Sequence, residues 1–371
     1  MSPRIIHFTT VHPAQDIRIF VKECRTLAAA GYDVTLIAPA APEDPIDGVR
    51  FVSLPLASGG RVRRAVTGNL RLLRMLLAMR GDVYHFHDPE LLPLGVLLRA
   101  FGRAVVYDVH EDVVDDIRSK AYIPRAIRSL LVAPVWFLEW LMGRVATHVV
   151  AATDGVVRRV PASRTTIVHN YPLREELPSA GSDVSEYCDR ALRGGYVGAL
   201  TPPRQANEMF AAADALHARR PGFALVTAGP TFGIDDPGTH PGVDHRGTIA
   251  RADVVRLLGE CRFGVTLLRD LPHLAASLPT KFYEYAAAGL PVIVSRSNTP
   301  IVEIVEETNC GLVVDETSPA AIEQAMEWIL DHPCGAHEMG QRGARAVRER
   351  FQWEAEAPRL LDVYRRITGG P

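Results

Sequence analysis

Short apolar runs rich in β-branched residues alternate with longer segments of helical periodicity along the whole chain. The run at 4–10 (RIIHFTT) precedes a helical pattern over 18–30, which is followed by a second apolar run at 32–39 (YDVTLIAP). Buried parallel strands that are joined by crossover helices produce this alternation. The pattern therefore predicts an α/β fold with parallel sheets.

The alternation occurs in two series, which are separated at 173–193 by a polar stretch containing Pro and Gly. A chain of 371 residues also exceeds the roughly 250–300 residues at which a single core stops growing. We therefore predict two doubly wound domains in tandem, an N-terminal one over 1–180 and a C-terminal one over 190–351, followed by a helix over 352–371. Ligands of such sheets bind at the carboxyl ends of the strands, so candidate site residues are sought there.

Composition narrows the class of protein. The chain is 47% hydrophobic and 23% charged, which is typical of a folded globular protein, and its net charge of −2 does not suit a nucleic-acid-binding surface. Its five cysteines are scattered without a C-x-x-C pair, which indicates reduced thiols and no zinc or redox centre. The first residues lack the pattern of a signal peptide, so we expect a cytoplasmic location.

The most informative segment is 277–295, SLPTKFYEYAAAGLPVIVS. Here Thr280 is predicted to be the N-cap of a short helix over 281–288, with Gly289 as the C′ residue. A helix N-terminus that also carries Lys281 attracts a diphosphate, because the helix dipole and the side-chain charge both favour an anion. Glu284, about one turn further, is placed to accept hydrogen bonds from ribose hydroxyls.

These residues resemble the retaining glycosyltransferases of family 4, in which a helix reading E-A-x-A-x-G-x-P-V follows the donor-binding loop. The resemblance implies the GT-B fold, with two facing Rossmann-like domains, an active site in the cleft between them, and a C-terminal helix that crosses back to the first domain. The family's second motif glutamate, which holds the donor ribose, corresponds to Glu284, whereas the first falls on Ala276. The chain follows a family variant, S-L-P-T-K-x-x-E-Y, at every fixed position from Ser277 onward.

The resemblance also assigns donor-side roles in the loop that follows the first strand of the second domain, YVGALTPPRQ. Gly198 permits close approach of the backbone, and Arg204 corresponds to the family's basic residues that grip the donor diphosphate. Arg204 and Lys281 are therefore the expected catalytic cations. Gly247 is expected near the base pocket, and Ser277 and Thr280 are expected to contact the donor.

In the first domain, the strand AVVYDVH ends in His110, which stands where the family has a histidine near the hydroxyls of the donor sugar. Glu111 follows it and is a candidate on the acceptor side. The run HFHDPE supplies His87 and Asp88, for which acceptor contacts and loop scaffolding are equal alternatives. The spacing in this run matches no closed tetrahedral zinc site, and the resemblance implies an enzyme that needs no metal.

The loop after the first strand offers further candidates on the acceptor side. Asp16, Arg18 and Lys22 either reach the cleft or are an ordinary N-cap with solvated charges in the first helical turn. The sequence leaves both alternatives open.

The resemblance implies transfer of a hexose-type sugar from a UDP-, GDP- or dTDP-linked donor to a hydroxyl group, with retention of the anomeric configuration and no cofactor. The acceptor is a glycan, a lipid-linked molecule or a small molecule, in polysaccharide, glycolipid or secondary-metabolite glycoside biosynthesis. Two alternatives share the donor cleft: a sugar-nucleotide epimerase and a non-catalytic nucleotide-sugar-binding protein. A nicotinamide dehydrogenase is disfavoured, because no G-x-G-x-x-G opens a helix after the first strand.

Two basic amphipathic segments, at 61–80 and 118–144, are relevant to where in the cell the protein lies. The second combines Trp136 and Trp140 with basic residues but is too interrupted to span a bilayer. The segments either cover the first sheet as ordinary helices or contact an anionic membrane, which would place the protein at the inner face of the cell membrane.

Overall fold

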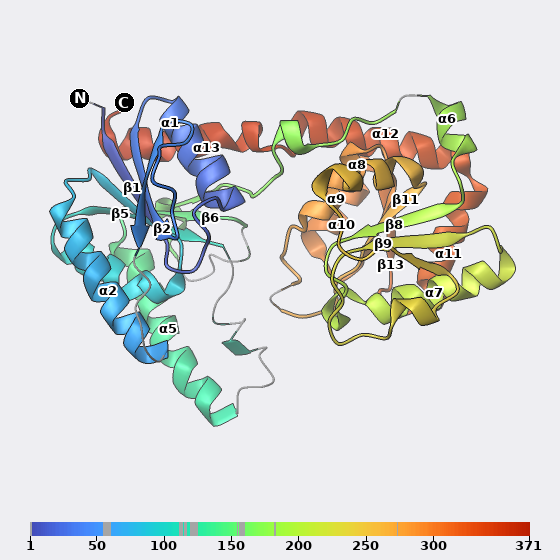
Figure 1. The fold of residues 1–371 in the computed structure, drawn as a ribbon, viewed down its shortest axis with the longest axis horizontal. Coiled ribbons are helices and arrows are strands. Elements are labelled where there is room, and N and C mark those ends of the chain that lie inside the picture. The colour runs from blue at the N-terminus through green and yellow to red at the C-terminus, as the bar shows by residue number, and fades with distance from the viewer. Residues whose placement is uncertain are drawn as a thin grey trace. The chain divides into compact units, whose positions relative to one another are not determined.

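The computed structural model of the 371 residues describes the chain in two compact units, shown in Figure 1. Met1–Asn170 and Trp353–Pro371 form the first unit, and Tyr171–Gln352 forms the second. The described residues are all except 1, 55–60, 111–113, 115–116, 119–124, 154, 156–159, 182 and 273, and the side chains of 61–67, 125–131 and 251 are likewise not described.

The first unit contains a seven-stranded parallel sheet with the strand order β3-β2-β1-β4-β5-β6-β7. Its strands are β1 (Arg4–Phe8), β2 (Asp33–Pro39), β3 (Val49–Leu54), β4 (Val83–Phe86), β5 (Ala104–Val109), β6 (His148–Ala151) and β7 (Thr165–Ile167). Its principal helices are η1 (Ile17–Cys24), α1 (Arg25–Ala29), α2 (Arg61–Ala78), α3 (Leu92–Ala100), α5 (Arg125–Val145) and α13 (Trp353–Thr368). The order reverses direction between β1 and β4, so the carboxyl ends of these two strands mark the topological switch point of a doubly wound sheet.

Alternation along β1 and β4 sends side chains to opposite faces of this sheet. Ile6 and Phe8 join a hydrophobic core with residues of α2, α3 and α5. His7 and His85 point to the opposite face, where both lie against Tyr364 of α13. Figure 1 shows α1 and α13 on one side of the sheet and α2 and α5 on the other.

The second unit contains a six-stranded parallel sheet with the order β10-β9-β8-β11-β12-β13. Its strands are β8 (Arg193–Val197), β9 (Ala224–Ala228), β10 (Val243–His245), β11 (Phe263–Thr266), β12 (Val292–Ser295) and β13 (Gly311–Val314). Its helices of six or more residues are α6 (Val184–Asp189), α7 (Ala206–Arg219), α8 (Arg251–Glu260), α9 (Thr280–Ala287), α10 (Thr299–Thr308), α11 (Pro319–Asp331) and α12 (Pro333–Arg350). One core packs α8, α9, α10 and α12 against this sheet, and a second core packs α7 and α11.

The N-terminal stretch of the first unit ends at Asn170, ten residues before the end that we predicted for the N-terminal domain. The segment from Tyr171 onward joins the second unit because its side chains pack there. The ring of Tyr171 lies 5.0 Å from that of Tyr283 and 5.5 Å from that of Phe351, and Arg174 Nε donates to Gln352 Oε1 over 2.9 Å.

The final helix belongs to the first unit. Trp353 is buried at its start, and its Nε1 donates to Thr26 Oγ1 over 3.0 Å. Tyr364, two helical turns before the end of the chain, is fully buried in the same unit. The chain thus leaves the first unit after Asn170 and returns to it at Trp353.

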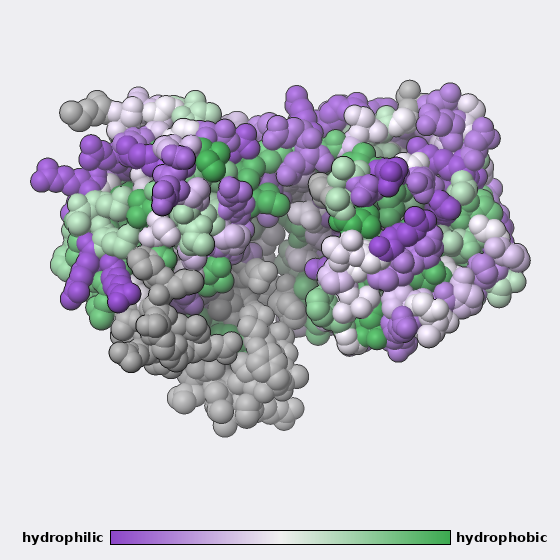
Figure 2. All heavy atoms as spheres, viewed as in Figure 1, coloured by the Kyte–Doolittle hydropathy of each residue, from purple (hydrophilic) through white to green (hydrophobic). Residues whose placement is uncertain are grey.

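The described surface gives no sign of a membrane span. Among the described residues, no helix has the length and apolar character needed to cross a bilayer. On the face shown in Figure 2, hydrophobic residues are interspersed with hydrophilic ones. Leu72 and Leu76 of α2 are buried in the core of the first unit, so the described part of this helix packs on the sheet.

Candidate functional site

Glycine turns follow three adjacent strands at the carboxyl edge of the second sheet. Gly198, Gly229 and Gly247 follow β8, β9 and β10, with φ of +127°, +138° and +62°. The Gly198 N–H donates to Ala228 O over 2.8 Å, and the Gly229 N–H donates to Gly247 O over 2.7 Å. A Cβ at Gly229 would overlap the carbonyl of Gly198. Glycine is therefore required for the backbone to fold closely at this edge.

Helix α9 begins beside these turns with its first residue at Thr280. We predicted Thr280 as the N-cap, and that prediction is wrong: Pro279 is the N-cap, and no side chain caps the helix. The proline fixes an extended backbone immediately before the helix, with φ of −66°, so the hydroxyl of Thr280 belongs to the first turn. Uncapped N–H groups at a helix start are a ready site for an anion.

The two predicted cations flank Gly198. A Cβ at Gly198 would lie 2.9 Å from Lys281 Nζ and 3.5 Å from an Arg204 guanidinium nitrogen. Lys281 Nζ also lies 3.9 Å from the centre of the Tyr196 ring, and Arg204 donates to Ala199 O over 3.3 Å. Burial, followed by the charge of Arg204, holds the pKa of Lys281 well below its usual range. An anion at this turn would relieve the repulsion between the two cations.

The remaining donor-side residues lie on the same helix and the loop before it. Ser277 Oγ donates to Leu274 O over 2.8 Å, and Asn298 Nδ2 donates to Ser277 O over 3.1 Å. These bonds fix the loop but already engage the Ser277 hydroxyl. Glu284 is partly buried on α9, one turn beyond Lys281, and Gly289 has φ of +74° directly after the C-cap, as predicted for the C′ residue.

Sequence reasoning missed the role of Tyr285 in holding this helix. Its phenol oxygen accepts from the Val197 N–H over 2.7 Å, which ties α9 to the last residue of β8. Tyr285 is fully buried, and a Cβ at Gly264 of β11 would overlap its ring. Only the match of Tyr285 to the family motif hinted at this role.

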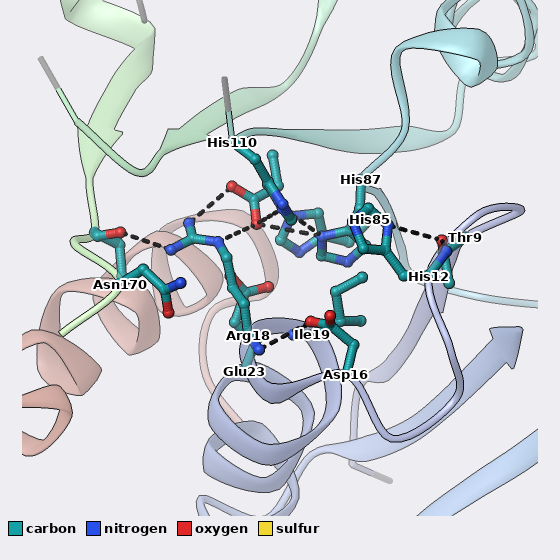
Figure 3. A network of polar contacts seen from close by, with 12 residues as sticks. Thr9, His12, Asp16, Arg18, Ile19, Glu23, His85, His87, His110 and Asn170 are labelled. Atoms are coloured by element: carbon teal, nitrogen blue, oxygen red, sulfur yellow. Dashed lines mark hydrogen bonds and ion pairs between the residues drawn. The ribbon is translucent and has the colours of Figure 1, made fainter. Parts of the chain in front are cut away.

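A second group of polar side chains lies at the carboxyl ends of β1, β4 and β5 in the first unit (Figure 3). Its centre is Asp108, which is fully buried on β5. Arg18 Nε donates to Asp108 Oδ2 over 2.9 Å, and a second guanidinium nitrogen donates to Oδ1 over 2.8 Å. Burial alone would raise the pKa of Asp108, but Arg18 and His110 hold it well below its usual range. Asp108 is therefore a buried carboxylate.

His110 is partly exposed at the surface, with 21% of its side chain accessible. Its Nε2 lies 3.0 Å from Asp108 Oδ2. A carboxylate that accepts from one ring nitrogen fixes the tautomer and orientation of an imidazole, so the other nitrogen is presented outward. Asp108 is thus the residue that orients His110.

His87 and Asp88 are both buried, so the scaffolding alternative fits them and contact with an acceptor does not. His87 Nδ1 lies 3.2 Å from Asp108 Oδ2. Asp88 Oδ2 accepts from Thr9 Oγ1 over 2.8 Å and from the Thr10 N–H over 2.6 Å. Burial opposes ionisation of Asp88, but its hydrogen bonds, with that to the His12 ring first among them, lower its pKa to about 2.

Asp16 is an ordinary N-cap, because its carboxylate accepts from the Arg18 and Ile19 N–H groups, each over 2.9 Å. Arg18 and Lys22 are 4% and 1% exposed, so neither a solvated charge nor direct contact with an acceptor describes them. Lys22 Nζ donates to Asn170 Oδ1 over 2.6 Å. Glu111 lies outside the described residues.

Comparison with known proteins supplies the family context. A model of the glycosyl transferase 4-like domain matches residues 19–171, and a model of glycosyl transferases group 1 matches residues 191–332. A curated relative, an MMP α-(1→4)-mannosyltransferase of Mycolicibacterium hassiacum, is 23% identical over 313 residues, which cover 80% of this chain and 74% of the relative. These matches support a glycosyltransferase of the GT-B type. The epimerase and binding-protein alternatives are not favoured.

Solved structures agree with this fold. Sucrose-phosphate synthase from Thermosynechococcus elongatus superposes with a TM-score of 0.71 at 17% identity, covering 99% of both chains. WaaG, a glycosyltransferase involved in lipopolysaccharide biosynthesis, gives a TM-score of 0.70 at 13% identity over 99% of this chain and 100% of its own. Anabaena HepE in complex with UDP-glucose gives 0.70 at 13% identity, covering 98% of this chain and 99% of its own. The two parallel-sheet units are those of the GT-B fold.

Proposed function

We propose that this glycosyltransferase moves a hexose-type sugar from a nucleotide-sugar donor to an acceptor hydroxyl with retention of the anomeric configuration. The observation that carries the proposal is the placement of Arg204 and Lys281 at one glycine turn beside the uncapped start of α9. Two cations and free amide groups at a strand end suit a diphosphate. The solved complex of HepE with UDP-glucose supports a nucleotide sugar as the ligand of this fold.

The two cations would act on the leaving group. Departure of the sugar leaves negative charge on the diphosphate, and preorganised cations and dipoles stabilise that charge most strongly where water is excluded. The close backbone turn at Gly198 allows the phosphates to approach, and Gly247 would border the base. Glu284 would accept hydrogen bonds from the ribose. The hydroxyl of Thr280, in the first turn of α9, would donate a hydrogen bond to the donor. Ser277 would contribute by fixing the conformation of the loop before this helix.

The first unit would complete the reaction on the sugar and the acceptor. His110, oriented by Asp108, would bind hydroxyls of the transferred sugar. The departing phosphate oxygen would deprotonate the acceptor on the same face, so the configuration is retained and no protein nucleophile is needed. The diphosphate would be neutralised by Arg204 and Lys281 without a metal ion. The proposed acceptor is a glycan, a lipid-linked molecule or a small molecule that carries a free hydroxyl.

The proposal is tested with Arg204→Ala, Lys281→Met and the double variant. A thermal-shift screen of UDP, GDP and dTDP sugars first identifies the donor, since a ligand of the native state raises its stability. Each single variant should lower kcat/KM about 10²- to 10³-fold, the usual cost of removing one charge-stabilising group. Arg256→Ala is the matched control, because Arg256 is 74% exposed and pairs only with nearby Asp253 in the described structure. Unchanged turnover in the double variant would refute the assignment.

Retention is tested separately by NMR of the product, in which the anomeric proton and carbon report the new linkage. A linkage with the configuration of the donor is expected. An inverted linkage would reject the mechanism while leaving the donor site in place.

We also propose a peripheral contact with an anionic membrane through α5. Trp136 and Phe137 are 43% and 50% exposed on this helix, and Phe137 stacks on Trp140 at 5.9 Å. The Arg144 guanidinium lies 4.1 Å over the Trp140 ring, so aromatic and cationic groups meet as they do at lipid headgroups.

Sedimentation with phosphatidylglycerol-containing vesicles at low salt tests this contact. The wild type should sediment with the vesicles, and Trp136→Ser with Phe137→Ser should not. Trp328→Ser is the control, because Trp328 is similarly exposed, at 39%, on α11 of the other unit. A wild type that stays in the supernatant would contradict the membrane contact.

A further inference from the structure

Three imidazoles and one carboxylate meet in the interior of the first unit. His7 comes from β1, His85 from β4, His87 from the residue after β4, and Glu23 from η1. None of the four is more than 2% exposed. One nitrogen or oxygen atom from each lies within 4.8 Å of those from the other three. Figure 3 labels three members of this cluster, Glu23, His85 and His87.

Each imidazole is held by one ring nitrogen and presents the other to the cluster. His87 Nδ1 lies 3.2 Å from Asp108 Oδ2. The hydroxyl of Tyr364 lies 2.6 Å from His85 Nδ1 and 3.1 Å from His7 Nε2. The nitrogens that remain are His7 Nδ1, His85 Nε2 and His87 Nε2. Histidines that ligate a metal are usually anchored in this way through the second nitrogen.

Of the atoms that face the centre of the cluster, His7 Nδ1 and His87 Nε2 lie 3.1 Å apart and share a hydrogen bond, whereas the others have none. His85 Nε2 and both carboxylate oxygens of Glu23 are buried without a hydrogen bond. Glu23 has an ion pair on one side, where its Oε1 lies 3.2 Å from Arg18 Nε. Buried polar atoms without partners are costly, and each such atom in a folded protein requires an explanation. A cation bound between His85 and Glu23 would satisfy both residues.

We propose that the cluster binds one Zn²⁺ ion through His7 Nδ1, His85 Nε2, His87 Nε2 and a carboxylate oxygen of Glu23. Three imidazoles and a carboxylate suit zinc, which prefers a tetrahedral arrangement. Zinc bonds of about 2.0–2.1 Å place ligand atoms roughly 3.4 Å apart, so a pair at the 4.8 Å limit would close by roughly 1.4 Å on binding.

The site would be structural. All four positions are filled by protein, so no position remains for water or substrate. The ion would join β1, β4 and η1, and Tyr364 would extend the connection to α13. The zinc site is separate from the proposed sugar transfer, in which no metal ion contacts the diphosphate.

The experiment measures metal in the full-length protein, purified without a histidine tag or a metal column. Mass spectrometry of the metal content should give about one zinc per chain. Removal of the ion under mild denaturation and its return should lower and then restore Tm by several degrees. Cobalt in place of zinc should give the visible absorption of a tetrahedral centre. These readouts do not depend on glycosyltransferase activity.

Variants locate the ion. His85→Ala and the more conservative Glu23→Gln should each lose the bound metal. His110→Ala should retain it, because His110 belongs to a different group that contains His87 and Asp108. Wild-type protein that neither contains zinc nor takes it up on refolding overturns the proposal. Loss of metal in His110→Ala, with retention in His85→Ala, overturns it as well, since it would move the ion to that other group.

Discussion

At the scale of single residues, Lys281 shows how a binding site can disfavour the charged form of a side chain as long as no anionic ligand is bound. The side chain is partly buried, faces the Tyr196 ring and lies beside the guanidinium of Arg204. Burial and this second cation both disfavour the ammonium form, so the pKa of Lys281 is well below its usual range. A diphosphate counteracts both influences, because its negative charges favour the ammonium form of Lys281.

Binding of a nucleoside diphosphate should therefore be coupled to proton uptake at Lys281. The bound anion raises the pKa of the lysine, so at a pH near the pKa of the free protein the ammonium form becomes more populated on binding. Calorimetric titration with UDP in two buffers of different ionisation enthalpy measures the number of protons taken up.

Lys281→Met is the control for this coupling, because protons exchanged by the nucleotide itself are common to both proteins. The wild type should take up more protons than Lys281→Met at the same pH. Equal proton numbers for the two proteins would show that Lys281 does not titrate on binding.

The sequence was sufficient to predict Arg204 and Lys281 at one donor site, because Arg204 stands in the loop after a predicted strand and Lys281 stands at the start of the predicted helix that carries the family motif. The sequence was not sufficient to predict that Arg18 and Lys22 are buried. The partners that bury them lie far along the chain: Arg18 bonds to Asp108, 90 residues away, and Lys22 bonds to Asn170, 148 residues away. The cluster around His85 could not be predicted from the sequence for a similar reason. The run HFHDPE alone lacks the spacing of a zinc site, and Glu23 comes from an element far away in the sequence.

At the scale of elements, glycines allow helices to pack closely against one another and against the sheet, because they have no side chain at the contact. A Cβ at Gly340 of α12 would overlap the carbonyl of Gly289, the residue that follows the C-cap of α9. The start of α9 lies at the candidate diphosphate site, so the packing of α12 helps to fix that site. Capping signals in the sequence predicted α9, but they contain no information on how closely another helix packs against it.

Replacing Gly340 by alanine should destabilise the second unit by about 1–3 kcal/mol, the usual cost of overpacking a filled interior. Gly259→Ala is the matched control, because Gly259 lies in helix α8 with no neighbouring atom within 4 Å of an added Cβ. That change should be neutral or stabilising by up to about 1 kcal/mol, since alanine is the better helix former. Urea unfolding measures both free energies. Equal effects of the two substitutions would contradict the packing argument.

At the scale of the whole molecule, the chain crosses between its units twice, after Asn170 and before Trp353. The polar composition of 173–193 indicated a boundary, but the structure places it earlier, because Tyr171 packs with Tyr283 and Phe351. A polar composition indicates that a boundary lies nearby. It does not show in which of the two cores the neighbouring apolar side chains pack. The closing helix α13 is held near this crossing by Glu356.

Glu356 gives the attachment of α13 a predictable dependence on pH. Its Oε2 accepts from the His169 N–H over 3.1 Å, and its Oε1 lies 3.3 Å from His169 Nδ1. Burial opposes ionisation of Glu356, but the contacts with His169 prevail and lower its pKa from the ordinary 4.5. A carboxylate whose pKa is lower in the folded state stabilises the fold at pH values above its unfolded pKa, and this contribution is lost as the pH falls through the folded value.

Glu356→Gln should therefore lower the free energy of unfolding of the first unit by about 1 kcal/mol at pH 7, the typical difference between a hydrogen bond to a charged group and one to a neutral group. The difference between wild type and variant should narrow as the pH falls below about 4.5, because the wild-type carboxyl then takes up its proton. Urea unfolding at a series of pH values measures this difference. If the difference does not change with pH, the ionised form of Glu356 contributes nothing beyond the hydrogen bond that glutamine also accepts.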